Sequence, residues 1–427
     1  MMEREPKTKA IMVGLQLGDD PDFDYSMEEF KNLAAARDVE VVGVVTQKAE
    51  KIHPATFIGS GKLEEVKALA EGLDADEVLF NDELSPAQIK NLEKKLERRI
   101  VDRTMLILDI FAERAKTKEA QLQVEAAQLR YMLPRLVGLR EALSRQGGGA
   151  GSGLRNRGAG EKKLELDRRR IEDRLAALED ELKKFADRRN VLRRQRRKNE
   201  LPVVSLVGYT NTGKSSLMNA LLEQVQGRPD PDKKVLAKDM LFATLETATR
   251  RIRLSGGKEF LLTDTVGFVS RLPHHLVKAF RSTLEEAAEA DLLLHVVDAA
   301  NPHRDAWIEV TNETLQALGA DRIPTLMVYN KVDLTDRTEP RTEGEAVYVS
   351  ALRKEGLDLL LEAIAGRLFG DYVRGELLIP FDQGHLVAYF NEHADVRSTR
   401  YLENGTLLEV ECRAADYERY REHFLES

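Results

Sequence analysis

The chain has 427 residues, more than a single hydrophobic core usually supports, so we expect two to four domains. Its net charge of −8 disfavours general attraction to nucleic acid, although a local basic patch is compatible with it. No apolar run approaches the ~18–20 residues that span a bilayer, and the charged N-terminus lacks a secretory signal's apolar stretch. The single cysteine, Cys412, excludes an internal disulfide and favours a reducing compartment. We therefore expect a soluble cytoplasmic protein without stable membrane insertion, with peripheral membrane attachment left open.

The first part of the chain alternates short β-rich runs with amphipathic stretches. Strands are expected at 9–13, 39–46 and 77–80, and helices at 27–37, 62–71 and 86–98. Ser85 before Pro86 is a good start for the last helix, because serine caps helices and proline suits their first position. This alternation predicts a small α/β domain with a largely parallel sheet, over residues 1–112.

Long helices are expected next. Apolar residues recur at three- and four-residue spacing over 113–133, where a helix should end before Pro134, and a charged helical stretch covers 161–199. The glycine-rich segment 146–161 between them predicts a basic loop joining two antiparallel helices, which together form a domain over 113–200. An α/β pattern over 201–370 predicts a domain with a mostly parallel sheet. The strand-like LLIPF, LVAYF and TLLEVEC and a helical end predict a small α+β domain over 371–427.

The sequence GYTNTGKSS begins at Gly208, between a strand-like run at 203–207 and a helix-like run at 216–223, and fits the phosphate-binding P-loop pattern. Its backbone N–H groups and the helix N-terminus suit phosphate. Lys214 is expected to reach the β- and γ-phosphates, and the Ser215 hydroxyl to bind Mg²⁺. A chance match in a chain of this length is roughly 1–2%. The residues predicted to bind nucleotide here are Gly208, Tyr209, Thr210, Asn211, Thr212, Gly213, Lys214, Ser215 and Ser216.

A second motif, DTVG, follows the apolar strand FLLT. Asp264 stands at the strand end, where a carboxylate on the metal side is needed, and Gly267 leaves its backbone N–H free to meet the γ-phosphate. D-x-x-G alone is common, and an aspartate at a strand end is usually only a turn residue. The predicted site residues here are Asp264, Thr265, Val266 and Gly267.

Guanine recognition is predicted by NKVD after the buried strand LMVY, and by SAL after a further strand. Asp333 can accept hydrogen bonds from guanine N1–H and the 2-amino group, which adenine cannot supply as a pair. The Lys331 stem can cover the base, Asn330 can tie this loop to the P-loop, and the Ala351 N–H can meet guanine O6. The chance of all motifs occurring in order, each after a strand, is roughly one in 10⁵. The predicted residues are Asn330, Lys331, Asp333, Ser350, Ala351 and Leu352.

A switch threonine that completes Mg²⁺ coordination only in the GTP state is expected between Lys214 and Asp264. Spacing favours Thr244 but leaves Thr247 and Thr249 as alternatives. The metal ligands are then Ser215, Thr244 and Asp264, and the catalytic residues Lys214, Thr244 and Gly267. The surrounding predicted nucleotide contacts are Phe242, Ala243, Thr244, Leu245 and Glu246.

The P-loop, FATLE, DTVGF, NKVD and SAL together resemble the Obg–HflX group of translational GTPases. LQVEAAQLRYMLPRL, SRQGGGAGSG and DRRRIEDRL more specifically resemble the HflX family, over nearly the whole chain. The resemblance implies an N-terminal HflX domain, a helical linker, a G domain and a variable C-terminal domain. It also implies a GTPase using GTP, GDP and Mg²⁺ that binds the large ribosomal subunit and separates stalled or idle ribosomes. Separately from the resemblance, we expect a monomer. By motif matching, Thr244 takes the family's switch threonine.

The sequence departs from the family pattern in two segments. The glycine-rich loop is longer and has Ala159 in place of a proline, so its reach and RNA contacts are expected to differ. Glu246-TATR replaces a common DPTTR without changing Thr244.

Phe268 occupies the position where many small GTPases carry a water-orienting glutamine. A phenyl ring cannot hydrogen-bond water, which predicts slow intrinsic hydrolysis stimulated by the ribosome. For ribosomal RNA, the expected contacts are Arg155 and Arg157 in the glycine-rich loop and the basic run RRQRRK at 193–198.

Two other functions remain open: a ribosome-assembly or RNA-maturation GTPase, and a nucleotide-controlled module that recruits a protein through the N-terminal domain. The glycine-rich IGSGK at Ile58 could mark a second nucleotide site, but it lacks P-loop spacing and an ordinary turn into a helix is favoured. His53, His274, His275 and His295 show no metal-ligand spacing, and Trp307 is interpreted as a packing residue.

Overall fold

The structure is a computed structural model that describes residues 7–145, 154–198, 201–226, 242, 247–254, 258–271 and 287–425. Side chains are described for these residues except 136–145, 154–164, 190 and 192–198. The described residues form two compact units. The first contains those up to Arg194 together with Phe242 and 269–271, and the second contains the remainder. Within the part of the chain that the structure describes, no helix is long and apolar enough to cross a bilayer.

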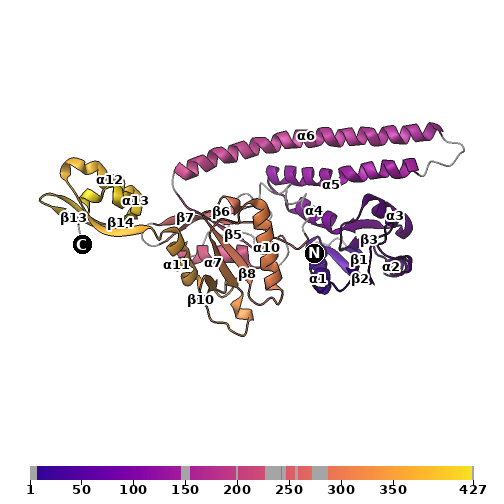
Figure 1. Cartoon of the computed structure of the whole chain (residues 1–427), viewed down its shortest axis with the longest axis horizontal. Helices are drawn as coiled ribbons and strands as arrows, with labels where there is room; N and C mark the ends of the chain where they lie inside the picture. Colours follow the sequence, from indigo (N-terminus) through magenta and orange to yellow (C-terminus); the bar gives the residue numbers. More distant parts are fainter. Residues whose placement is uncertain are drawn as a thin grey trace, which may run out of the picture. The chain divides into compact units, whose positions relative to one another are not determined.

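The first unit begins with a four-stranded parallel sheet in the order β2-β1-β3-β4, which confirms the predicted α/β arrangement (Figure 1). Val13, Val78 and Phe80 belong to its apolar core. The predicted cap of α3 is also confirmed, because Ser85 and Gln88 form a reciprocal capping box. The strands are β1 (Thr8–Leu17), β2 (Val39–Ala49), β3 (Glu77–Phe80) and β4 (Arg99–Asp102), with α1 (Phe23–Ala36), α2 (Ser60–Gly72) and α3 (Pro86–Leu96) between them.

Most of the helix expected at 113–133 lies in α5 (Lys118–Arg145), while its first two residues end a separate helix, α4 (Arg103–Arg114). Helix α4 is capped by Asp102, whose Oδ1 accepts the Met105 N–H at 2.9 Å. After a short break, Thr117 Oγ1 accepts the Ala120 N–H at the start of α5. The side chains of Asp102 and Thr117 therefore cap the first turns of α4 and α5. Apolar periodicity alone does not reveal where these two helices begin.

The prediction that the helix ends before Pro134 is wrong, because α5 continues through it to Arg145. Proline inside a helix costs about 3 kcal/mol locally. The next residue, Arg135, binds the carboxylate of Asp102 at 3.0 Å and the Leu84 carbonyl at 3.2 Å. These tertiary contacts offset the local penalty.

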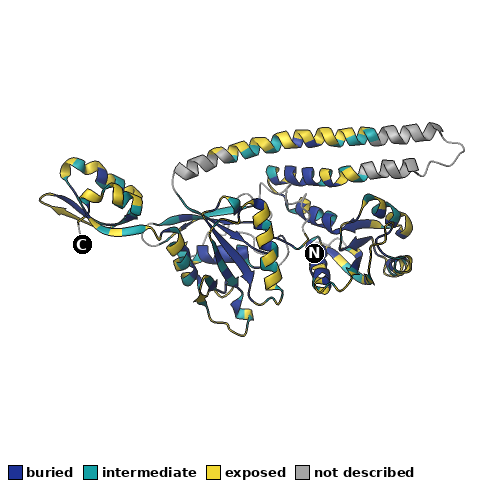
Figure 2. Cartoon of the chain, in the orientation of Figure 1, coloured by how far each residue is buried: buried dark blue, intermediate teal, exposed yellow. Residues whose placement is uncertain are grey.

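Two antiparallel helices are confirmed: α5 and α6 (Leu154–Lys198) run side by side (Figure 1). Leu122 and Ala126 of α5 pack with Leu175 and Leu178 of α6, and ion pairs such as Arg130–Glu179 join them. Among the α6 side chains that the structure describes, most of the others are exposed or partly exposed (Figure 2).

The expected non-helical loop at 146–161 is wrong for its second half, since α6 begins at Leu154. Glycine costs only about 1 kcal/mol in a helix interior. A helix as long as α6 can therefore include Gly158 and Gly160, while residues 146–153 lie outside those described.

The second unit is built on a seven-stranded sheet in the order β10-β11-β9-β8-β5-β7-β6. Its central strands are parallel, and only the edge pairs β6–β7 and β10–β11 are antiparallel, which confirms the predicted sheet. The elements are β5 (Val203–Val207), α7 (Lys214–Gln226), β6 (Ala248–Arg253), β7 (Glu259–Asp264), β8 (Leu292–Asp298), α10 (Arg304–Leu318), β9 (Thr325–Asn330), β10 (Arg341–Glu343), β11 (Ala346–Tyr348) and α11 (Leu357–Leu368).

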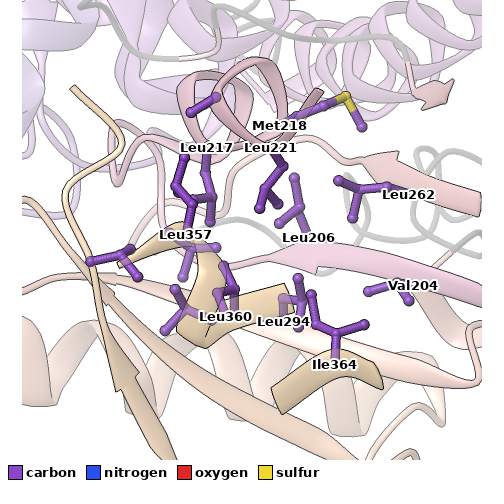
Figure 3. Packing of buried hydrophobic residues seen from close by; sticks show 14 of the residues in the cluster. Val204, Leu206, Leu217, Met218, Leu221, Leu262, Leu294, Leu357, Leu360 and Ile364 are labelled. Atoms are coloured by element: carbon purple, nitrogen blue, oxygen red, sulfur yellow. The ribbon is translucent and has the colours of Figure 1, made fainter. Parts of the chain in front are cut away.

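The core of this unit lies between the sheet and two neighbouring helices, α7 and α11 (Figure 3). Leu217 and Leu221 of α7 pack with Leu360 of α11 and with Leu206 and Leu294 of the central strands. β8 is buried over its whole length, and its side chains are apolar except for His295 and the final Asp298. This packing fixes the strand ends from which the site loops emerge.

The last part of the chain forms a three-stranded antiparallel sheet with short helices, which confirms a small α+β arrangement. The expected strand LVAYF is wrong, since it lies in α12 with Leu386 and Phe390 buried one turn apart. A short apolar run does not distinguish a strand from a buried helix face. The elements are β12 (Tyr372–Ile379), α12 (Gly384–His393), β13 (Asp395–Leu402), β14 (Gly405–Arg413) and α13 (Ala414–Arg419).

Candidate nucleotide-binding site

Loops after β5, β7, β9 and β11 meet at the carboxyl edge of the large sheet. Asn330 Nδ2 donates to the Thr212 carbonyl at 2.9 Å, so the β9 loop holds the P-loop. Asn330 Oδ1 accepts the Ala351 N–H at 3.0 Å, so the same amide also holds the β11 loop. Thr210 N–H donates to the Phe268 carbonyl at 2.7 Å, which joins the P-loop to the β7 loop. The structure therefore brings all four predicted motifs together.

The P-loop backbone requires glycine at two positions. Gly208 has φ +140°, and a Cβ there would lie 2.3 Å from the Val296 carbonyl oxygen. Gly213 has φ +92°, and a Cβ there would lie 2.3 Å from Asn330 Nδ2. Both are conformations that L side chains rarely adopt. The loop therefore packs directly against the strand and the side chain beneath it.

Lys214 is buried at the start of α7, and its ammonium donates to the carbonyls of Gly208 at 3.0 Å and Tyr209 at 2.6 Å. Burial lowers the pKa of Lys214 to about 8, against the opposing effect of the Asp264 carboxylate. The side chain thus remains largely cationic at neutral pH.

Oxygen ligands gather beside this lysine. The Ser215 hydroxyl donates to Asp264 Oδ2 at 2.5 Å, so a hydroxyl and a buried carboxylate face the same point. Such oxygens are the ligands that Mg²⁺ prefers, so this pair fits the ion. Thr265 serves a different purpose, since its hydroxyl donates to the Leu206 carbonyl within the sheet.

Gly267 and Phe268 pack against the P-loop. A Cβ on Gly267 would lie 2.7 Å from Thr210 Cα and 2.9 Å from Lys214 Nζ, so no side chain fits there. The Phe268 N–H donates to the Gly208 carbonyl at 3.1 Å, and its ring is buried. Phe268 thus acts through its backbone and its packing, with its ring away from solvent.

On the base side, Ser350 Oγ donates to Asp333 Oδ1 at 2.5 Å, which leaves the carboxylate in a fixed orientation. Lys331 has a left-handed backbone, φ +64°, and its ammonium donates to the Asn211 carbonyl at 2.7 Å. The Ala351 N–H is already used by Asn330, and Leu352 is exposed. The backbone N–H of Ala351 as a guanine O6 donor therefore stays a prediction.

The switch residues are only partly described. Ala243, Thr244, Leu245 and Glu246 lie outside the described residues. Phe242 belongs to the first unit, where its ring packs edge-to-face on Phe111 at 4.7 Å. Of the alternative threonines, Thr249 lies inside β6 and hydrogen-bonds Thr263 across the ladder at 3.1 Å. A strand position of this kind disfavours a role that requires a mobile loop.

Three residues that carry no motif also lie beside the site. Trp307 of α10 stacks on Tyr209 of the P-loop with ring centroids 4.4 Å apart, which confirms its expected packing role. Asp298 ends β8 and binds the Lys331 ammonium at 2.7 Å. His295 pairs in register with Val207, next to the P-loop. The apolar residues around His295 in β8 are compatible with its burial, and Asp298 ends the same strand, but no motif marked either residue.

No group of three or more histidine, cysteine or acidic residues able to hold a metal occurs among the described residues. The four site loops thus offer one small oxygen-ligand pair beside a buried lysine and a P-loop, together with a carboxylate at the base end. This arrangement suits a magnesium-bound nucleoside phosphate.

Known proteins match this chain along its length. Family profiles match residues 24–112 (GTP-binding GTPase N-terminal), 114–196 (GTP-binding GTPase Middle Region), 203–331 (50S ribosome-binding GTPase) and 333–421 (HflX C-terminal domain). GTPase HflX of Caldanaerobacter subterraneus is 46% identical, covering 97% of this chain and 93% of its own. GTPase HflX of Escherichia coli is 40% identical, covering 96% and 95%. The chain belongs to the HflX family of GTPases. It is therefore a P-loop GTP hydrolase, as the motifs predicted.

A solved structure of a GTP-binding protein from Sulfolobus solfataricus in complex with GDP is also similar. It is 23% identical, covers 84% of this chain and 99% of its own, and has a TM-score of 0.42.

His295 makes the stability of the second unit depend on pH. Burial, and then the Lys214 ammonium, lower the pKa of His295 to about 4, whereas an unfolded histidine titrates near 6.5. Below pH 6.5 the unfolded chain therefore takes up the proton first, and stability falls by up to about 1.4 kcal/mol per pH unit until about pH 4. His295→Gln should flatten this slope between pH 7 and 5.

The measurement is urea unfolding followed by the fluorescence of Trp307, the only tryptophan of the chain, which reports on this unit. His385→Gln, at an exposed position of α12, should leave the slope unchanged. An unaltered slope in His295→Gln would show that His295 is not the titrating group.

Proposed function

We propose that this GTPase binds guanine nucleotide with Mg²⁺ at the four-loop site and couples the bound state to ribosome dissociation. The observation that carries the nucleotide part is the Asn330 amide, which holds the P-loop and the β11 loop together at the sheet edge. The ribosomal part is supported by the family profile over 203–331, described as a 50S ribosome-binding GTPase.

On the phosphate side, the P-loop N–H groups and the N-terminus of α7 are proposed to cradle the phosphates. Lys214 then turns from the Gly208 and Tyr209 carbonyls to the β- and γ-phosphates. Ser215, Asp264 and Thr244 are the proposed metal ligands. Mg²⁺ bound there neutralises phosphate charge. The Gly267 N–H is proposed to meet the γ-phosphate, where only glycine allows this approach.

On the base side, Asp333 is proposed to accept from guanine N1–H and the 2-amino group. Ser350 orients that carboxylate, and the Lys331 stem covers the base plane. A site built around two hydrogen bonds to a charged acceptor rejects a base that lacks the matching donors, because the carboxylate is then left unpaired.

For hydrolysis, this arrangement lacks a water-orienting side chain at position 268. Phe268 is buried, and its backbone is bonded to the P-loop. Hydrolysis then relies on Lys214, Thr244 and Gly267 and on a partner that orders the switches. The ribosome is the proposed partner.

The helical pair is the proposed ribosome contact. α5 and α6 are held together by their own apolar seam and by ion pairs such as Arg174–Glu125. Arg155 and Arg157 lie at the start of α6, beyond this apolar seam in the sequence, so the seam does not require them. Basic side chains on such a projection suit RNA phosphates, with 23S-type large-subunit RNA as the proposed target.

Base recognition is tested with Asp333→Asn. The amide presents one acceptor and one donor, so the donor opposes the guanine 2-amino group, and GTP affinity should fall on the order of a hundredfold or more. Xanthosine triphosphate, with an oxygen at that position, should instead bind better than to the wild type. Calorimetric titration measures both, with exposed Asp336→Asn as the control. Wild-type protein binding ATP as tightly as GTP would contradict the assignment.

The intrinsic hydrolysis rate should be low, on the order of 10⁻⁴–10⁻³ s⁻¹, the range of a small GTPase without its activator. Adding large ribosomal subunits should raise kcat by orders of magnitude. Phosphate release assays with and without subunits measure this. Fast hydrolysis by the protein alone, unaffected by subunits, would refute the proposed mechanism.

Ribosome dissociation is tested by light scattering of intact ribosomes mixed with protein and a non-hydrolysable GTP analogue. Scattering should fall as subunits separate. Arg155→Gln/Arg157→Gln should weaken subunit binding and lower its salt slope by about two, with GTP affinity unchanged. Arg169→Gln/Arg170→Gln removes the same charge from exposed positions of α6 and is the matched control.

The outcomes separate the alternatives. Subunit binding without dissociation would favour an assembly or RNA-maturation GTPase. Ribosome affinity that is equal for both double variants and the wild type would remove Arg155 and Arg157, which lie in the first turn of α6 and not in the expected loop, from the mechanism and favour a protein-recruiting module.

A further inference from the structure

Asp298 is an acidic residue at the end of β8, and it belongs to none of the nucleotide-binding motifs. β8 pairs with β9 so that Asp298 lies directly opposite Asn330. The two oxygens of its carboxylate have separate partners. Oδ1 accepts the Ala300 N–H at 3.1 Å, and Oδ2 accepts the Lys331 ammonium at 2.7 Å. Only 13% of the Asp298 side chain is exposed, so this ion pair is largely shielded from solvent.

Lys331 is held from two sides. Its ammonium reaches Asp298 at 2.7 Å and the Asn211 carbonyl of the P-loop at 2.7 Å. Its backbone has φ +64°, a left-handed conformation that costs a non-glycine residue energy and persists only when its surroundings fix it. The four methylene groups between a fixed backbone and a fixed ammonium therefore have little freedom.

We propose that Asp298 is a positioning residue for nucleotide binding. It holds the Lys331 side chain in the orientation in which the methylene stem covers the base. The inference rests on the proposed role of Lys331. Asp298 itself touches no nucleotide in this arrangement. Its carboxylate fixes the ammonium, and the Asn211 carbonyl then sets the distance between the base loop and the P-loop.

This role predicts a particular kinetic pattern. The base is the same in GTP and GDP, so loss of the anchor should weaken both nucleotides to the same extent. The phosphate side is untouched, so hydrolysis of GTP already bound should proceed at the wild-type rate. KM should rise while kcat with ribosomal subunits stays constant.

Asp298→Asn isolates the contact with Lys331. The amide oxygen can still accept the Ala300 N–H, so the turn after β8 keeps its hydrogen bond. Its NH₂ group then faces the Lys331 ammonium, donor against donor. The Kd for both GTP and GDP should rise on the order of ten- to a hundredfold, with a thermal midpoint close to that of the wild type. Asp305→Asn, an exposed aspartate on α10, is the matched control and should change neither value.

A double-mutant cycle with Lys331→Met provides the decisive test. Methionine keeps much of the apolar stem and removes the ammonium. If Asp298 acts through that ammonium, Asp298→Asn should add no further loss of nucleotide affinity in the Lys331→Met background. Calorimetry with GDP on the full chain gives the four affinities.

Losses that multiply in the double variant would overturn the inference, because Asp298 would then act independently of Lys331. Wild-type nucleotide affinity in Asp298→Asn would also overturn the inference. If Lys331→Met and Lys331→Ala nevertheless reduced the affinity, the proposed base site would stand without a role for Asp298. Unchanged affinity in both Lys331 variants would remove Lys331 from the site, and this inference with it.

Discussion

The side-chain amide of Asn330 is the contact on which the candidate site depends. Its NH₂ group donates to the Thr212 carbonyl in the P-loop, and its oxygen accepts the Ala351 N–H in the β11 loop. A side-chain amide carries a donor and an acceptor on one rigid plane. Three loops from different strands therefore have one relative placement. The close approach of Gly213 to the same amide leaves no room for a side chain at position 213.

The charges beneath the P-loop form a second constraint. Lys214 is buried, yet it stays largely cationic because the Asp264 carboxylate opposes the desolvation. His295, one strand away, is held neutral by burial and by the same lysine. A second cation there would raise the cost of keeping Lys214 charged. Beneath the P-loop, a neutral His295 therefore leaves Lys214 as the cation, where a phosphate would need it.

The sequence predicted the strand-to-loop junctions of the site because each motif stood after a buried apolar run. Parallel strands place their carboxyl ends at one edge, so convergence of the motifs followed from topology. The contact of Asp298 with Lys331 could not be predicted in this way. The two residues are distant in sequence, and their contact exists only because β8 and β9 are neighbours. Strand order is a tertiary property that local pattern does not encode.

The errors in secondary structure have related causes. Pro134 ends an isolated helix, but Arg135 binds Asp102 and Leu84 from another part of the first unit. The run LVAYF is too short for its apolar pattern to distinguish a strand from a helix. In the structure it is helical, and burial of Leu386 and Phe390 on one face stabilises that helix. In both places a distant contact outweighed a local preference. The cap by Ser85, whose partner Gln88 lies three residues along the chain, was predicted correctly.

The base end and the phosphate end of the site differ in how many of their functional side chains are already held by hydrogen bonds or ion pairs. Around the base loop, Asp333 is bonded to Ser350, Lys331 to Asp298, and Asn330 to two other loops. Such a network fixes geometry before a base arrives, which favours discrimination because little ordering remains to oppose binding. Around the phosphate loop, the position that could orient water carries a buried phenyl ring. Under the proposed function, selectivity is therefore a property of this chain alone. Rapid hydrolysis requires groups or ordering that a partner supplies.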